Sequence, residues 1–137
     1  MPLLHHASLV SSLFLATSAS SATAECDRVA SVFFEYRSAV VLTRARQTLE
    51  VLAAQLPTGS RVVLRGHISA EELAEDGSTG LDENRAAVTA YRLSAAADAK
   101  TLTVERESAG STEPYSAEGP DQAFDRRVDI WLCPAGA

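Results

Sequence analysis

The stretch RVVLRGHISAEELAEDG, residues 61–77, joins an apolar run to an acidic one. Its first part, 61–67, is largely apolar and ends in Gly-His, which predicts a strand that is covered on at least one face. Four acidic residues follow, and we expect them in a loop that runs to Gly80: Glu71, Glu72, Glu75 and Asp76. The end of a strand that opens into a loop is a common place for a binding site, but such a run is also typical of a solvated loop.

Helical periodicity flanks this strand on both sides. In 42–56, apolar residues recur at the 3.6-residue spacing of an amphipathic helix. The stretch 82–99 predicts a second helix, with Asp82 as its N-cap and Arg85 close behind it.

Three further strands complete the pattern, at 28–36, 101–107 and 126–132, and a long polar loop separates the last two. The element order is therefore β-α-β-α-β-β. Strands joined through helices are expected to run parallel, and the final pair can run antiparallel. This order predicts an α/β chain of the α+β two-layer type, with a mixed four-stranded sheet and both helices on one face.

The first 24 residues are typical of a secretory signal peptide. Residues 1–24 contain no charged side chain, hold an apolar run at 9–16, and end in the cleavage pattern Ala-Thr-Ala. The apolar run is too short to span a bilayer, which takes about 20 residues. Glu25 stands directly before Cys26, which argues against a lipid anchor. We therefore expect an exported single domain, residues 25–137, that does not itself span a membrane.

The formal net charge of −6 makes nucleic acid an improbable partner. The two cysteines, Cys26 and Cys133, lie near the two ends of this domain, and in an exported protein they predict a disulfide, with two free thiols as the alternative. A bridge fits if the first and last strands are antiparallel neighbours. No metal cluster, cofactor motif or nucleophile constellation is present, so the sequence predicts no enzyme.

Four motifs in order resemble the OmpA-like C-terminal domain, the peptidoglycan-associating module of Gram-negative envelopes. They are VFFEYRSAVVL at 32–42, GHIS at 66–69, LDENRA at 81–86 and DRRVDI at 125–130. The resemblance covers residues 28–132. It implies a periplasmic domain, associated with the outer membrane only through a partner.

The resemblance also implies a ligand, the diaminopimelate of the peptidoglycan stem peptide, which offers an ammonium and a carboxylate. By position, Arg85 and Arg126 carry over as carboxylate-binding and pocket-lining residues, and His67 belongs to the same site. The family aspartate that meets the ammonium falls on neutral Ser69, and the family asparagine falls on Ser78.

A substitute carboxylate is therefore needed. Glu71 is the first candidate, and the others are Glu72, Glu75, Asp76, Asp82 and Asp125. The simpler interpretation makes Arg85 and Arg126 surface arginines paired with the acidic loop, and His67 a structural histidine.

Two functions follow from this interpretation. The first is a non-enzymatic periplasmic module that binds peptidoglycan through diaminopimelate. The alternative is a degenerate OmpA-like domain that has lost wall binding and acts as a protein-interaction or envelope-assembly subunit, for which the change at Ser69 argues.

Overall fold

The computed structural model describes residues 25–76 and 80–134. The predicted signal peptide, 1–24, and Ser78 lie outside the described residues.

Four strands form one mixed sheet: β1 (Asp27–Phe33), β2 (Arg61–His67), β3 (Thr103–Gly110) and β4 (Arg127–Cys133). The strand order is β1-β4-β2-β3. β2 and β3 are parallel neighbours, whereas β4 runs antiparallel to both β1 and β2. The predicted mixed four-stranded sheet is therefore confirmed, and the last strand in sequence is inserted between the first two.

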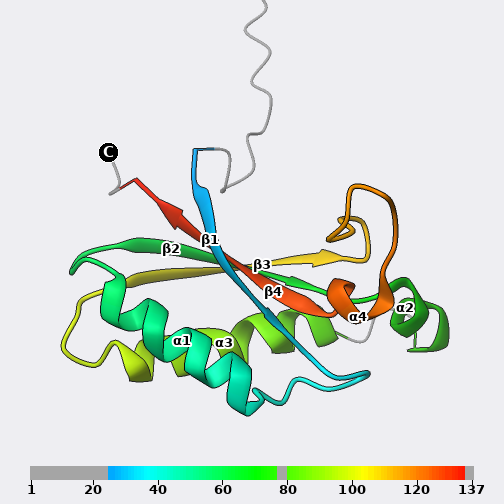
Figure 1. The fold of residues 1–137 in the computed structure, drawn as a ribbon, viewed down its shortest axis with the longest axis horizontal. Helices are drawn as coiled ribbons and strands as arrows, with labels where there is room; N and C mark the ends of the chain where they lie inside the picture. Colours follow the sequence, from blue (N-terminus) through cyan, green and yellow to red (C-terminus); the bar gives the residue numbers. More distant parts are fainter. Residues whose placement is uncertain (1–24, 77–79, 135–137) are drawn as a thin grey trace, which may run out of the picture.

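Two long helices, α1 (Thr43–Gln55) and α3 (Leu81–Ala96), cover one face of this sheet (Figure 1). Their apolar stripes pack with the inward side chains of the strands into one core, which includes Leu49, Leu64, Leu93, Val128 and Ile130. The predicted two-layer arrangement is thus confirmed.

Two short helices lie where the sequence predicted loops. α2 (Ala70–Asp76) takes up the acidic stretch, and α4 (Gln122–Asp125) lies in the polar segment before β4. Figure 1 shows both at the same end of the sheet. The prediction of an acidic loop was wrong for 70–76 because Ser69 supplies the side-chain cap of a helix, as described below.

The predicted start of α3 was also wrong. Gly80, with a φ of 73°, precedes the helix, and Asp82 lies within its first turn. The Asp82 carboxylate instead accepts hydrogen bonds from the amides of Glu83, at 2.9 Å, and Gly110, at 3.0 Å. Asp82 therefore ties α3 to the end of β3.

The predicted disulfide joins Cys26 and Cys133, whose Cα atoms are 4.2 Å apart. Because β1 and β4 pair antiparallel, the residue before β1 meets the last residue of β4. The sequence predicts this bridge if the first and last strands are antiparallel neighbours, and they are.

Candidate functional site

The end of β2 brings the start of α3 into close contact with the sheet. A Cβ atom at Gly66 would overlap the backbone carbonyl of Asp82 and touch Ala86. Glycine is therefore required here for packing, because no larger residue leaves room for the helix backbone. The close approach places Arg85, one turn into α3, beneath the end of the strand.

Arg85 is fully buried, and all five of its N–H groups donate hydrogen bonds to other residues of the chain. Nε donates to Ser38 O at 2.9 Å, Nη1 to His67 O at 3.0 Å and Nη2 to Glu35 O at 3.2 Å. The two remaining N–H groups bind the Glu72 carboxylate in a bidentate pair, at 2.8 Å and 2.6 Å. Arg85 thus has no donor left for a ligand in this structure.

Glu72 reaches Arg85 because α2 begins with a capping box. The Ser69 hydroxyl accepts a hydrogen bond from the Glu72 amide at 3.2 Å, and the Glu72 carboxylate accepts one from the Ser69 amide at 3.0 Å. The Arg37 amide donates to the same carboxylate at 2.7 Å. The signal was present in the sequence as Ser-x-x-Glu at 69–72.

Burial by itself would raise the pKa of the Glu72 carboxyl. The hydrogen bonds from Arg85 and from the amides of Ser69 and Arg37 outweigh burial, and the pKa lies below its ordinary value. Glu72 is therefore a stable anion, and it stands against Arg85 as the carboxylate of a ligand would.

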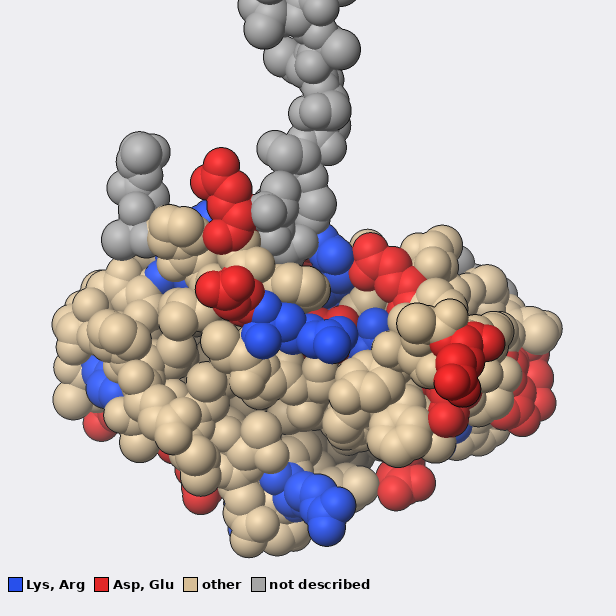
Figure 2. All heavy atoms as spheres, turned by 45° about the horizontal axis from the view of Figure 1, so that its top comes forward, with Lys and Arg blue, Asp and Glu red and all other residues tan. Residues whose placement is uncertain are grey.

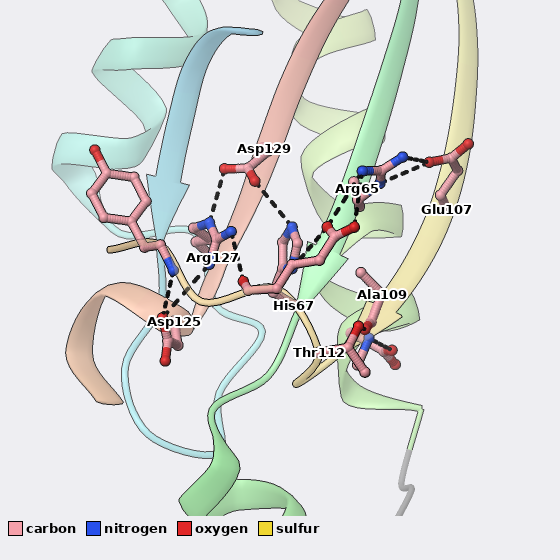
Figure 3. Close-up of polar contacts among 12 residues, drawn as sticks. Arg65, His67, Glu107, Ala109, Thr112, Asp125, Arg127 and Asp129 are labelled. Atoms are coloured by element: carbon pink, nitrogen blue, oxygen red, sulfur yellow. Dashed lines mark hydrogen bonds and ion pairs between the residues drawn. The ribbon is translucent and has the colours of Figure 1, made fainter. Parts of the chain in front are cut away.

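His67 lies on the opposite face of the sheet, in a chain of charged side chains (Figure 3). Its Nε2 is 3.0 Å from Asp129 Oδ2, and its Nδ1 is 4.0 Å from Glu113 Oε2, although neither nitrogen makes a hydrogen bond of good geometry. Asp129 also accepts hydrogen bonds from Arg127 at 2.9 Å and from Ser31 at 2.6 Å. His67 is fully buried within this network.

Burial would raise the pKa of Asp129, but contacts from His67, Arg127 and Ser31 lower it well below its ordinary value. Figure 2 shows basic side chains in a band across this face, with acidic side chains beside them. Arg65, beside His67 in Figure 3, pairs with Glu107 at 2.8 Å and with Glu113 at 3.2 Å. The face is thus an internally compensated charge network.

Arg126 makes fewer hydrogen bonds than Arg85. Its Nε donates to Phe34 O at 3.1 Å, and in the described part of the chain its two Nη groups have no acceptor. The side chain lines a cavity of about 430 Å³ between β1, α1 and α4. The two arginines therefore bind successive carbonyls of the chain after β1, yet only Arg126 keeps free donors.

Solved structures with the same fold come from bacterial envelope proteins. The peptidoglycan-associated lipoprotein of Burkholderia pseudomallei is 25% identical, with a TM-score of 0.59 over 77% of this chain and 90% of its own. The cell wall anchor of the type VI secretion system (T6SS) of Pseudomonas aeruginosa is 29% identical, with a TM-score of 0.54 over 74% of each chain. The OmpA-like domain of FopA1 from Francisella tularensis is 15% identical, with a TM-score of 0.56 over 76% and 71%.

The fold is OmpA-like. The resemblance inferred from the four motifs is confirmed by these neighbours. No protein-family model matches the chain, and no curated protein sequence does.

The OmpA-like domain does not bring the six residues of the predicted ligand site together in one pocket. Arg85 and Ser69 are buried together with Glu72, and His67 faces the charge network on the other side of the sheet. Glu71 is exposed, and Asp82 holds the end of β3. Arg126 borders the cavity. The carboxylate at Arg85 thus comes from Glu72, one residue beyond the first candidate.

The described residues of the OmpA-like domain contain neither a metal site nor a membrane-spanning helix. In 25–76 and 80–134, no group of three His, Cys, Asp or Glu side chains is arranged to hold a metal ion. No helix within the same ranges is long and apolar enough to cross a membrane.

Proposed function

We propose that residues 25–137 form a non-enzymatic periplasmic domain that associates with peptidoglycan. The observation that carries the proposal is the fold shared with a peptidoglycan-associated lipoprotein, at 25% identity over 77% of the chain. The likeness to a cell wall anchor, at 29% identity, supports the same assignment. Association with the outer membrane would then run through a protein partner.

Within this function, the domain recognises the diaminopimelate of the stem peptide. A free carboxylate is best held by an arginine with open N–H groups, which Arg126 has and Arg85 lacks. Arg85 has a structural role, because its guanidinium group holds the carbonyls of Glu35 and Ser38 in the segment that follows β1.

A second function is favoured by the Glu72–Arg85 pair. An OmpA-like domain whose arginine is saturated by its own glutamate has the properties of a degenerate member that no longer binds the wall. Such a domain would act as a protein-interaction or envelope-assembly subunit.

Co-sedimentation with purified diaminopimelate-type sacculi tests the two functions. We expect residues 25–137 to pellet with the sacculi, Arg126→Ala to pellet less, and Arg46→Ala to behave like the parent, since Arg46 lies on exposed α1 surface and pairs with Glu50. If the parent stays in the supernatant, wall binding is refuted and the degenerate function takes its place. Release of soluble muropeptides would contradict the non-enzymatic assignment.

A further inference from the structure

The cavity that Arg126 borders runs along a free edge of the sheet. β1 stands at one end of the strand order, and β4 is its one neighbour among the described strands. Five consecutive residues, 31–35, line the cavity, although successive side chains of a strand point to opposite faces. A cavity over one face would be lined by alternate residues. We call this cavity of about 430 Å³ the edge slot, because its lining places it along the outer edge of the β1 backbone.

Backbone groups of β1 face the edge slot. The Phe34 amide donates to Arg126 O at 2.8 Å, and hydrogen-bonded residues alternate along an antiparallel pair. The amides and carbonyls of Ser31 and Phe33 therefore point away from β4. In the described part of the chain, none of these four groups has a backbone partner. A chain in extended conformation can pair with them as an added strand.

The two edges of the sheet differ in charge. β3, the other edge strand, carries three charged residues in succession, Glu105, Arg106 and Glu107, and charged side chains are a common device against edge pairing. The stretch VASVFF at 29–34 in and after β1 contains no charged residue. A bulge at Val29 interrupts the register only at the start of this stretch. β1 is therefore the edge that remains suited to pairing.

The walls of the edge slot determine what can pair there. Leu42, Ala45 and Thr48 line it from α1 and its cap, and Ala123 and Phe124 line it from α4. Because walls flank the β1 backbone on both sides, the slot admits one extended chain rather than the edge of a second folded sheet. The largely apolar walls favour a chain with apolar side chains at alternate positions.

The charge of the edge slot adds an acidic group to this description. Arg44 lines the slot, and its guanidinium group makes no hydrogen bond or ion pair within 25–76 and 80–134. An unpaired arginine is complementary to a carboxylate. The net charge of −6 also disfavours a second copy of this chain as the occupant.

We propose that the edge slot binds an extended segment of a partner protein, which adds to β1 as a fifth strand and places an acidic side chain against Arg44. The inference goes beyond the proposed function, because both candidate functions call for a protein partner and neither says how it is held. It does not depend on wall binding.

The test is an NMR titration of ¹⁵N-labelled residues 25–137 with a synthetic peptide that alternates valine and threonine and carries one glutamate. Two versions place the glutamate at either end, since an added strand can run in either direction. We expect the largest shift changes at the amides of Ser31 and Phe33, with nuclear Overhauser contacts between backbone protons of the peptide and of β1. Val104 and Arg106, whose amides face the opposite edge, should not shift.

N-methylation of the peptide separates backbone pairing from apolar contact. Alternate amides of an extended chain point to opposite sides, so methylation of one alternate set should abolish binding, and methylation of the other set should be tolerated. Equal binding by the two methylated peptides would overturn the inference.

Arg44→Ala should weaken the glutamate peptide about threefold and leave a peptide with glutamine in its place unchanged. Arg46→Ala is the matched control, because Arg46 lies on the same helix, pairs with Glu50 and does not line the slot. Equal binding of the glutamate peptide by Arg44→Ala and the parent would contradict the inference.

Two further outcomes would overturn it. One is the absence of shift changes on β1 at millimolar peptide. The other is a concentration-dependent dimer paired through β1, which would assign the slot to a second copy of the chain. Co-sedimentation with sacculi is a separate readout, so failure of the proposed wall binding and failure of this inference are distinguishable.

Discussion

At the scale of single residues, two buried carboxylates pair with the buried arginines of this domain. Glu72 accepts four hydrogen bonds, two from Arg85 and two from backbone amides. Asp129 is held by Arg127 and Ser31 and lies beside His67. A buried ion pair of this kind is costly to break from one side, because the remaining charge keeps no partner.

Replacing Glu72 by alanine should therefore lower the free energy of unfolding by about 3 to 5 kcal/mol. The loss combines an uncompensated Arg85 with a broken capping box. Urea denaturation measures it. Glu71→Ala is the control, because Glu71 is exposed and should change stability by about 0.5 kcal/mol or less. Equal stability of the two variants would contradict the role of the Glu72–Arg85 pair.

Acid should destabilise the domain through the same carboxylates. The folded-state pKa values of Glu72 and Asp129 lie below the ordinary 4.5 and 3.8. A lowered pKa stabilises the fold above the ordinary value, and this contribution is lost as the pH falls toward the folded-state value. We expect the free energy of unfolding to fall as the pH drops below about 5, and Asp129→Asn to make that fall shallower. Urea titrations at several pH values measure this dependence. If the free energy of unfolding falls equally steeply with pH in Asp129→Asn and in the parent, the prediction is wrong.

The sequence located Arg85 and Arg126 but could not give their partners. Arg85 is identified by its motif, whereas its counterion depends on how α2 folds back onto α3. Glu71 and Glu72 are neighbours in an acidic run, and only the helical geometry of 70–76 turns Glu72 inward. The residue types therefore predicted a site built from arginines. Which arginine keeps N–H groups without an acceptor depends on the three-dimensional fold.

At the scale of elements, Gly66 fixes how closely α3 approaches β2. Gly66→Ala should destabilise the domain by about 1 to 3 kcal/mol or more, because the added Cβ would meet the helix backbone rather than a flexible side chain. Thermal unfolding monitored by circular dichroism measures the effect. Ser108→Ala is the control, since Ser108 is exposed and lies opposite Gly66 in β3. A variant as stable as the parent would show that α3 can shift without cost.

The long elements were predictable because their periodicity is sustained. The residues of α1 and α3 repeat at helical spacing, and each of the four strands carries an apolar run or alternation. α2 and α4 are too short for periodicity to appear, and their polar composition indicates loops. Their caps, Ser69 with Glu72 and Asp121 with the Ala123 amide, were the only local signals.

At the scale of the whole molecule, the disulfide closes almost the entire described chain. Cys26 and Cys133 are 107 residues apart, for which the chain-entropy model assigns about 4 to 5 kcal/mol. We expect the double variant Cys26→Ser, Cys133→Ser to unfold at a markedly lower temperature than the oxidised parent. A reductant should bring the parent to the same temperature and leave the variant unchanged. A parent indifferent to reductant would contradict this contribution.

The topology was predictable from the order of elements together with the cysteines. Parallel crossovers set the direction of the first three strands, and the bridge required the first and last strands to be neighbours. The position of β4 between β1 and β2 satisfies both conditions. What the order could not give is the charge network on the second face, since it depends on the register that sets His67 beside Asp129.

Because the bridge joins the outer ends of β1 and β4, the described chain enters and leaves the fold at one point (Figure 1). Tension applied between residues 25 and 134 would cross one covalent bond instead of passing through the hydrogen-bonded strands. The residues between the two cysteines would then carry none of the applied force, and the core would stay folded under tension. Reduction of that bond would transfer the mechanical load to the β1–β4 ladder, where the strands would be drawn apart.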